Sequence, residues 1–544
     1  MQNSEKSDTS LSWELKIGDR VHAVGDRRRI GTVKYVGAVE GHSGLWVGID
    51  WDNGDAKHDG SFNGVRYFQA TSPKSASFVR PHNLSRGISF LDALKLRYCN
   101  HSSTKQEEDE MYVLSANNQR VSVQLVGKEK IEDKLSRFEE LTTASLSYLG
   151  VNSTGCSSEI SAIVSNLKEL DLTGNLLSEW KDVGAICEQL PALRVLNLTN
   201  NRMSHEVKGL PSLENIRVLV LNNTGVDWLQ VEMLKQWMPA IEELHLMGNN
   251  ITAIIPAFSS VVEGFNSLCL LNLEDNYLDQ WDEILKLSQL RSLEQLYLTK
   301  NNLRKIFYPD HQKMQEVFND YKSIESSHQP FQNLHCLLLG CNNIEDVASV
   351  DSLNLFPSLV DIRLSDNPIA DPGKGGIPRF AIIARLAKVK ILNGSEISSR
   401  ERKDSEIRYV RSILSKFYDS PEEIKRFHPR FAELKSLHGI EDERPSVGAT
   451  GPQKMASGLI SITLKCVGAS IGEKPPVTKK LPATTTVGKL KMLCESFFKL
   501  KSVKLKLFLQ EEGSPLPTLL DDEMASLMDI GIGQDSTILI DDES

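Results

Sequence analysis

Residues 167–177, LKELDLTGNLL, place leucines at positions one, four, six and eleven of the stretch and an asparagine at position nine. The same L-x-x-L-x-L-x-x-N-x-L pattern, with Ile, Val or Met at some leucine positions, begins again at residues 193, 216, 241, 268, 293, 334 and 359. Only the copy at 216 lacks the asparagine and carries Thr224 instead. A motif that returns every 23 to 27 residues, with one interval of 41, predicts a solenoid of stacked coils.

The pattern is typical of leucine-rich repeats, an α/β solenoid in which each x-L-x-L segment forms a short strand. A single coil cannot bury its leucines, whereas each leucine buried between stacked coils contributes about 1.5–3 kcal/mol. An asparagine at the turn can bond backbone groups that are left unpaired there. We therefore predict a ladder of turn asparagines: Asn175, Asn201, Asn249, Asn276, Asn301, Asn342 and Asn367.

The residues between the strand leucines are expected to line the concave face of the solenoid. They are mainly charged and polar, and include Glu242, Glu243, His245, Glu294, Gln295, Tyr297, Asp361 and Arg363. This mixture contains no catalytic set, and extended concave surfaces of solenoids usually bind other proteins. The concave face is therefore interpreted as a protein-binding surface.

The interval of 41 residues contains an insertion at residues 306–330, whose polar and aromatic character predicts a protruding loop or short helix. A functional contact and an insertion tolerated on one face are both consistent with it. After the last repeat, residues 379–414 carry apolar residues at helical spacing and an Asn393-Gly394 turn. This segment predicts a C-terminal cap on the solenoid.

Two polar segments divide the chain. Residues 101–110 separate an N-terminal module from the solenoid, and residues 439–458, rich in glycine, proline and charge, predict a flexible tether. Beyond the tether, the sequence predicts strand, hairpin, helix and further strands, the order of a ubiquitin-like β-grasp, with Thr485 or Thr486 as the helix N-cap. Because the sequence ends in DDES rather than Gly-Gly, we expect this domain to dock rather than to be conjugated.

The N-terminal module has glycine-separated segments of alternating apolar and polar residues, which predict a small all-β, barrel-like fold. Within it, residues 46–68 surround the polar loop at 57–61 with aromatic residues. This arrangement indicates a shallow groove with a cationic mouth, suited to an acidic peptide that ends in an aromatic residue and a free carboxylate. For Trp46, Phe62, Phe68 and Phe78, packing in the barrel core is an open alternative. The predicted peptide-binding residues are Trp46, Lys57, His58, Asp59, Gly60, Ser61, Phe62, Arg66, Phe68 and Phe78.

The loop AKHDG at residues 56–60 resembles the G-K-N-D-G hallmark of CAP-Gly domains, with Ala56 and His58 at two of its positions. His58, the order of the three modules, and the stretch RFHPRFAELKSLHG at residues 426–439 together resemble the tubulin-specific chaperone E family, also called tubulin-folding cofactor E. The domains are accordingly expected at residues 12–98 (CAP-Gly), 140–414 (leucine-rich repeats with a C-terminal cap), 415–458 (helical segment and linker) and 459–541 (ubiquitin-like).

The resemblance implies a cytoplasmic, cytoskeleton-associated folding cofactor. Its CAP-Gly groove would bind the acidic C-terminal tail of α-tubulin, while the repeats hold the body of that subunit. With other tubulin-folding cofactors it would assemble or dissociate the αβ-tubulin heterodimer. Two alternatives stay open: an adaptor that binds microtubules through the CAP-Gly module, and a shuttle that binds ubiquitin-pathway proteins through the C-terminal domain.

Charge and motifs argue against several other functions. A formal net charge of −10 disfavours a nucleic-acid partner, and no apolar run is long enough to predict a membrane partner or a signal peptide. The eight cysteines form no C-x-x-C pair and are expected to be reduced thiols, mostly buried. Because no motif of an enzyme, metal site or cofactor site is recognised, we predict a non-enzymatic protein without metal or cofactor.

Overall fold

The computed structural model describes residues 15–99, 112–114, 120–122, 137–256, 261–309, 329–417, 420–440, 459–468, 474–482, 485–500, 505–510, 517–520, 523, 527 and 532–542. Contacts divide the chain into two compact units, Met1–Asn302 with Pro309–Leu334, and Leu303–Tyr308 with His335–Ser544. Among the described residues, no helix has the length and apolar character needed to cross a membrane.

The N-terminal module is an antiparallel sheet of five strands in the order β6-β3-β2-β1-β7, which confirms the all-β prediction. Apolar residues that alternate along β1, β2 and β3 meet in its core, where Val21, Val33, Val47 and Ile49 are fully buried. A short β4-β5 pair follows the polar loop. The strands are β1 Arg20–Ala23, β2 Asp26–Val39, β3 His42–Trp51, β4 Ser61–Phe62, β5 Val65–Arg66, β6 Ala76–Val79 and β7 Leu84–Ser85.

Strand β8 (Ile88–Ser89) and helix α1 (Phe90–Tyr98) connect this module to the solenoid. β8 pairs in parallel with β12 (Val151–Ser153), and α1 lies beside the first solenoid strand, β11 (Thr143–Ser145). β11 belongs to a coil that the repeat pattern missed, because Ala144 stands at the second leucine position and Leu149 at the asparagine position. Strands β9 (Tyr112–Leu114) and β10 (Arg120–Ser122) form a separate antiparallel pair.

In the first unit, the repeats form a parallel, in-register run of strands from β11 to β18. The central leucine of each consensus strand pairs with the central leucine of the next, and from Leu170 to Leu296 these leucines are at most 2% exposed. The leucine-rich-repeat prediction is therefore confirmed. The consensus strands are β13 Glu169–Asp171, β14 Val195–Asn197, β15 Val218–Val220, β16 Glu243–His245, β17 Leu270–Asn272 and β18 Gln295–Tyr297.

The asparagine ladder is also confirmed. The Nδ2 of Asn276 donates to the carbonyls of Leu246 and Leu273, both at 3.0 Å. Its Oδ1 accepts from the backbone amides of Asn249 at 3.1 Å and Ile251 at 2.9 Å. The seven predicted asparagines are all at most 5% exposed. Each one therefore links two successive turns of the backbone.

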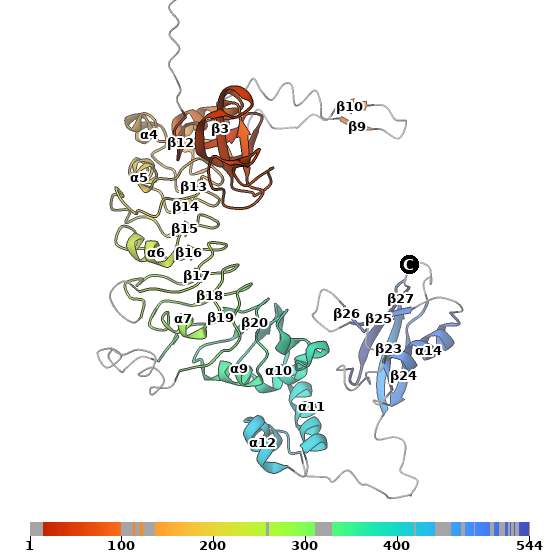
Figure 1. Cartoon of the computed structure of the whole chain (residues 1–544). Helices are drawn as coiled ribbons and strands as arrows, with labels where there is room; N and C mark the ends of the chain where they lie inside the picture. Colours follow the sequence, from red (N-terminus) through yellow and green to blue (C-terminus); the bar gives the residue numbers. More distant parts are fainter. Residues whose placement is uncertain are drawn as a thin grey trace, which may run out of the picture. The chain divides into compact units, whose positions relative to one another are not determined.

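Helices cover the side of the coils opposite the strands, as α4, α5 and α6 show in Figure 1. Helices α5, α6 and α7 each begin with a tryptophan, and Trp180, Trp228 and Trp281 are at most 3% exposed. These indole rings are therefore part of the buried core of the repeats. The helices are α4 Ser157–Ile163, α5 Trp180–Glu188, α6 Trp228–Leu234 and α7 Trp281–Leu285.

The second unit continues the repeats with two more consensus strands and then a helical cap. A turn at Asn393-Gly394 joins β21 to β22, and helices α10 to α13 share a buried cluster that includes Tyr409 and Leu434 in the region of the predicted C-terminal cap. The greater part of the predicted insertion at 306–330 lies outside the described residues. The elements are β19 Cys336–Leu338, β20 Asp361–Arg363, β21 Ile391–Leu392, β22 Ser395–Glu396, α9 Val347–Ser352, α10 Arg379–Arg385, α11 Ser399–Phe417, α12 Pro421–Phe427 and α13 Phe431–Leu437.

The C-terminal domain has one helix packed on a mixed sheet in the order β24-β23-β27-β25-β26, the β-grasp that the sequence predicts. The Thr486 hydroxyl accepts a hydrogen bond from the Lys489 amide at 3.3 Å, so Thr486 is the helix N-cap. The elements are β23 Leu459–Cys466, β24 Val477–Pro482, α14 Val487–Phe498, β25 Leu505–Gln510, β26 Thr518–Leu519 and β27 Ser536–Asp542.

All eight cysteines are free thiols, but the expectation that most are buried is wrong. Cys187, Cys466 and Cys494 are buried, whereas Cys99, Cys156 and Cys341 are exposed. Short 3-10 helices complete the described structure: η1 Pro81–Asn83, η2 Phe138–Glu140, η4 Leu353–Leu355, η5 Pro368–Ala370 and η6 Pro372–Lys374.

Candidate peptide-binding groove

A groove with a volume of about 540 Å3 lies on the N-terminal module between β3, β6 and the loop at residues 57–61. Five of the predicted residues line it: Trp46, Lys57, His58, Phe62 and Phe78. The other lining residues are Ala23, Val24, Arg29, Val39, His42, Trp51, Ser77, Val79 and Asn83. Among the described residues, the remaining predicted ones do not line the cavity: Asp59, Gly60, Ser61, Arg66 and Phe68.

Phe78 connects the groove with the core of the module. Its ring stacks on His58 with centroids 5.0 Å apart and meets the edge of Phe68 at 5.7 Å. Phe68 is only 9% exposed and packs into a small buried cluster. The alternatives that the sequence left open therefore divide: Phe68 is a core residue, Trp46 and Phe62 lie on the groove, and Phe78 does both.

Gly60 allows the polar loop to lie against the aromatic core. Its φ is +95°, and a Cβ at this position would lie 2.1 Å from the carbonyl oxygen of Phe68. On the other side, the Ala76 amide donates to the carbonyl of His58 at 2.8 Å, which fixes the loop to β6. A residue with a side chain at position 60 would push the loop off the sheet and open the groove.

Asp59 and Arg66 brace the loop from outside the groove. One carboxylate oxygen of Asp59 accepts from the Ser61 amide at 3.1 Å, and the other pairs with the Arg66 guanidinium at 2.8 Å. The bond from the Ser61 amide, followed by that from Arg66, lowers the pKa of Asp59. Arg66 therefore adds little positive potential to the groove, because its charge is paired with Asp59.

His58 contributes a neutral hydrogen-bond donor to the groove wall. The Gly60 amide donates to its Nδ1 at 3.2 Å, so the ring proton is on Nε2. Burial lowers the pKa of His58; the Asp59 charge opposes this shift, and the Lys57 charge adds to it. The imidazole is consequently uncharged at neutral pH.

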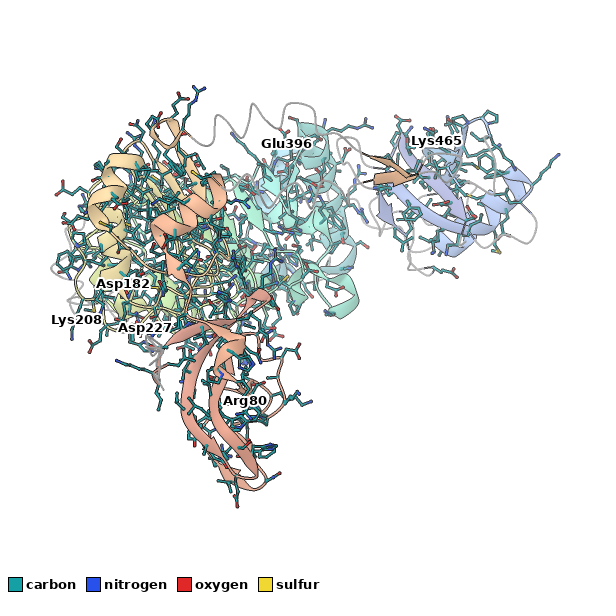
Figure 2. All side chains as sticks on the ribbon, turned by 90° about the horizontal axis from the view of Figure 1, so that it is seen from above. Arg80, Asp182, Lys208, Asp227, Glu396 and Lys465 are labelled. Carbon is teal, nitrogen blue, oxygen red and sulfur yellow. The ribbon has the colours of Figure 1, made fainter. Side chains whose placement is uncertain are left out.

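Two arginines cover the tryptophan rings at the groove. The guanidinium of Arg80 lies 3.8 Å above the Trp46 ring and donates to the carbonyl of Leu45 at 3.1 Å. Arg29 lies 4.7 Å from the centroid of the Trp51 ring. Figure 2 labels Arg80 on the N-terminal module. Arg29 and Lys57 line the groove, and Arg80 lies on the Trp46 ring that lines it, so the groove has a positive rim over aromatic walls.

Three of the lining side chains hold unpaired donors. The Nε1 atoms of Trp46 and Trp51 and the Nε of Arg29 are buried, and none has a hydrogen-bond acceptor among the described residues. A buried donor without an acceptor costs about 1–3 kcal/mol. An acceptor brought by a ligand would remove that cost.

Sequence reasoning missed His42 and Trp51 as lining residues. The ring of His42 lies 5.6 Å from that of Trp46 and 5.3 Å from that of Phe62. His42 and Trp46 are four residues apart on one strand, so the period of two puts them on the same face and provides a usable signal. Trp51 is five residues from Trp46, so alternation alone places it on the opposite face and gives no such signal.

The family comparison first establishes the class of the N-terminal module. The model of the CAP-Gly domain family matches residues 17–84, which contain β1 to β6, the first residue of β7 and the residues that line the groove. The module is therefore a CAP-Gly domain.

Relatives of the whole chain then establish the family. The Arabidopsis thaliana protein named tubulin-folding cofactor E is 64% identical over 529 residues, covering 97% of this chain and 98% of that protein. The Danio rerio protein named tubulin-specific chaperone E is 33% identical, covering 90% of this chain and 92% of that protein. The chain belongs to the tubulin-folding cofactor E family, whose vertebrate members are named tubulin-specific chaperone E.

A solved structure is similar to the C-terminal part of the chain. It is the solution structure of the C-terminal ubiquitin-like domain of mouse tubulin-specific chaperone E, with 21% identity and a TM-score of 0.15. The similarity covers 17% of this chain and 96% of that structure.

Proposed function

We propose that this protein is a tubulin-folding cofactor that binds α-tubulin through two surfaces. The CAP-Gly groove takes the acidic C-terminal tail of α-tubulin, and the concave face of the repeats holds its globular body. With other tubulin-folding cofactors, the protein assembles or dissociates the αβ-tubulin heterodimer. The printed names of the relatives, tubulin-folding cofactor E and tubulin-specific chaperone E, support tubulin as the client.

The observation that carries the proposal is the one-sided charge of the groove. Arg29 and Lys57 line it, and no Asp or Glu is found among its described lining residues, although the whole chain has a formal net charge of −10. Aromatic walls suit a terminal aromatic ring, and the unpaired N–H groups suit carboxylate oxygens. A short peptide held in this way would bind with roughly micromolar affinity, about −8 kcal/mol.

The strand register of the repeats supports a second contact with the tubulin body. It places Val195 beside Val218, and both side chains are half-buried on the strand face. Glu242 and Glu294 are exposed farther along the repeats of the same unit. A surface that combines apolar and charged side chains is typical of a protein interface.

A binding assay with three forms of tubulin tests the proposal. We expect the purified protein to bind soluble tubulin, and to bind it more weakly after the acidic tails are removed by proteolysis. Preference for polymerised microtubules would favour the adaptor alternative, and binding to proteasome subunits without tubulin binding would favour the ubiquitin-pathway alternative. Failure to bind soluble tubulin, with or without its tails, would refute the proposal.

A further inference from the structure

The CAP-Gly module and the first coil of the solenoid share a close backbone contact. Only Arg86 and Gly87 separate β7 from β8, so the connection is short. The Ile88 amide donates to the carbonyl of Gly150 at 2.8 Å. A Cβ on Gly87 would lie 2.0 Å from the same carbonyl oxygen. The segments that contain Gly87 and Gly150 can therefore approach this closely only because residue 87 is glycine.

Helix α1 extends this contact over the end of the solenoid. Its residues Phe90, Leu91, Ala93 and Leu94 are at most 4% exposed, so one face of the helix is buried. The hydroxyl of Tyr98 accepts a hydrogen bond from the Ser145 amide at 3.0 Å. Because α1 directly follows β8, the segment that leaves the CAP-Gly sheet also caps the first coil.

Tyr148 makes a contact between the two modules away from β8. It adopts a φ of 57°, and a Cβ on Gly174 would lie 2.1 Å from its ring, so the ring lies directly on that glycine. Its hydroxyl accepts from the Asn200 side chain at 3.1 Å. From the CAP-Gly module, the guanidinium of Arg28 lies 5.2 Å from the centroid of the ring.

A third contact is ionic. Arg202 directly follows the ladder asparagine Asn201. Its Nε lies 3.7 Å from a carboxylate oxygen of Asp52 on the CAP-Gly module. The same carboxylate is held by the buried Arg20 of β1. Three contacts at different positions oppose rotation of one module against the other more effectively than a single contact.

We propose that this junction is a positioning device: it holds the peptide groove in one orientation relative to the concave face, so that both act on one client molecule at once. The inference rests on the proposed function and adds a geometric requirement to it. Gly87, Gly150 and Tyr148 are the positioning residues. A client is selected when its acidic tail leaves its body at the place where the fixed groove can receive it.

The expected gain follows from effective concentration. When the repeats have bound the body, a groove held at the matching distance meets the tail as an intramolecular partner, and such coupling raises affinity by about 100-fold or more. A groove that rotates freely spends most of its time away from the tail, so the same two contacts would then give weaker binding. A junction that only caps the solenoid would stabilise the fold without coupling tail and body.

The test variant is Gly87→Val, which changes neither a groove-lining residue nor a strand of the concave face. Its control is Gly18→Val, because Gly18 also has a left-handed backbone, with φ +98°, but a Cβ there meets nothing within 4 Å. Faster hydrogen exchange at the Ile88 amide would verify that the junction has opened. Affinities are measured for a free acidic tail peptide, for soluble tubulin and for tubulin without tails.

We expect Gly87→Val to bind the free peptide and tail-less tubulin within about twofold of the unmodified protein, and intact tubulin about 10-fold more weakly. Gly18→Val should bind all three as the unmodified protein does. Unchanged affinity for intact tubulin, together with fast exchange at Ile88, would overturn the inference. Loss of binding by the unmodified protein itself would instead refute the proposed function.

A crosslink gives a second test if Gly87→Val does not fold. Ile88 and Val151 are partners in the β8–β12 pair, so Ile88→Cys with Val151→Cys can lock the junction by a disulfide. We expect the locked form to bind intact tubulin as tightly as the same protein after reduction, with the unmodified protein under both conditions as control. Recovery of tubulin binding only on reduction would mean that the groove must swing, and would overturn the inference.

Discussion

The asparagine ladder of the repeats and the CAP-Gly groove both contain buried polar side chains, but only the ladder pairs them fully. Asn276 makes hydrogen bonds through both its amide nitrogen and its amide oxygen to backbone groups of neighbouring coils. In the groove, Trp46, Trp51 and Arg29 each keep a buried N–H without an acceptor among the described residues. The turn asparagines are satisfied by the chain itself, whereas the unpaired donors of the groove can be satisfied by a ligand.

The largest difference between core and groove is expected in the unfolding free energies of two alanine variants, at Phe68 and at Phe62. Phe68→Ala should lower the unfolding free energy of the CAP-Gly module by about 3–5 kcal/mol, because it empties a site that is 9% exposed. The matched change Phe62→Ala removes a half-exposed ring on the groove and should cost about 1 kcal/mol or less. Urea denaturation measures both. Equal losses would show that Phe62, like Phe68, belongs to the core.

For peptide affinity, the order of the two substitutions should be reversed: in protein that remains folded, Phe62→Ala should weaken binding more than Phe68→Ala. Phe62→Ala should weaken binding of an acidic peptide ending in tyrosine while the module stays folded, since this ring lines the groove. Anisotropy measurements on the folded fraction separate this effect from the loss of structure in Phe68→Ala.

The ladder can be tested with two neighbouring asparagines. Asn301 donates to the carbonyls of Leu273 at 2.9 Å and Leu298 at 3.1 Å and accepts from the Leu278 amide at 3.0 Å. Asn301→Ala should lower the unfolding free energy by about 3 kcal/mol, because partners that lose a buried hydrogen bond cost about 1–3 kcal/mol each. Asn302→Ala, at the exposed next position, should change it by less than about 0.5 kcal/mol. Similar losses in urea denaturation would argue against a structural ladder.

The positive rim of the groove should give a smaller effect. Lys57→Ala is expected to weaken binding of the acidic peptide about fivefold, or about 1 kcal/mol, because it removes one cation from the groove without a change in the fold. The effect should shrink at high salt, which screens exposed charges. Lys74→Ala removes the same charge from an exposed site outside the groove and should leave anisotropy unchanged. If both substitutions weakened peptide binding equally, Lys57 would act only through the net charge of the module and not through its place in the groove.

The sequence predicts most of the repeats because their pattern is local and periodic. Each consensus leucine and asparagine acquires its partners from the next copy of the same motif, so one strand such as β13 predicts the environment of the others. The first coil was missed because Ala144 fills the strand position with less volume and Leu149 replaces the turn asparagine. Packing against α1 and β8 holds that coil from one side, and from the other it pairs with β13 and bonds to the side chain of Asn175.

The groove could be predicted only in part, because its residues come from separate strands. The loop residues Lys57 and His58 are recognisable in the sequence, and both line the cavity. The pairing of Arg66 with Asp59, which removes Arg66 from the positive rim, depends on how the loop folds back. The burial of Phe68 likewise depends on the close approach of Gly60 to its carbonyl. These contacts are not encoded in a local period.

The smallest change in stability is expected from the protonation of His428 in the C-terminal cap. Its Nδ1 can accept hydrogen bonds only while the ring is neutral. The Nδ1 of His428 accepts from the Arg385 guanidinium at 3.0 Å and the Tyr409 hydroxyl at 2.8 Å. Burial, followed by the charge of Arg385, lowers the pKa of His428 from 6.5 to about 4. Between these values the unfolded chain binds the proton and the folded chain does not, so stability is lost as the pH falls from about 6.5 towards 4.

Because His428 is partly exposed, the loss should be about 1 kcal/mol or less at pH 5, a shift of a few degrees in the Tm of the second unit. His428→Asn should flatten this part of the pH profile, since asparagine offers an acceptor that does not titrate. The ladder asparagines do not titrate either, so they add no pH dependence to the stability of the repeats over this range. An unchanged pH slope in His428→Asn would assign the effect to other groups and leave the histidine a packing role only.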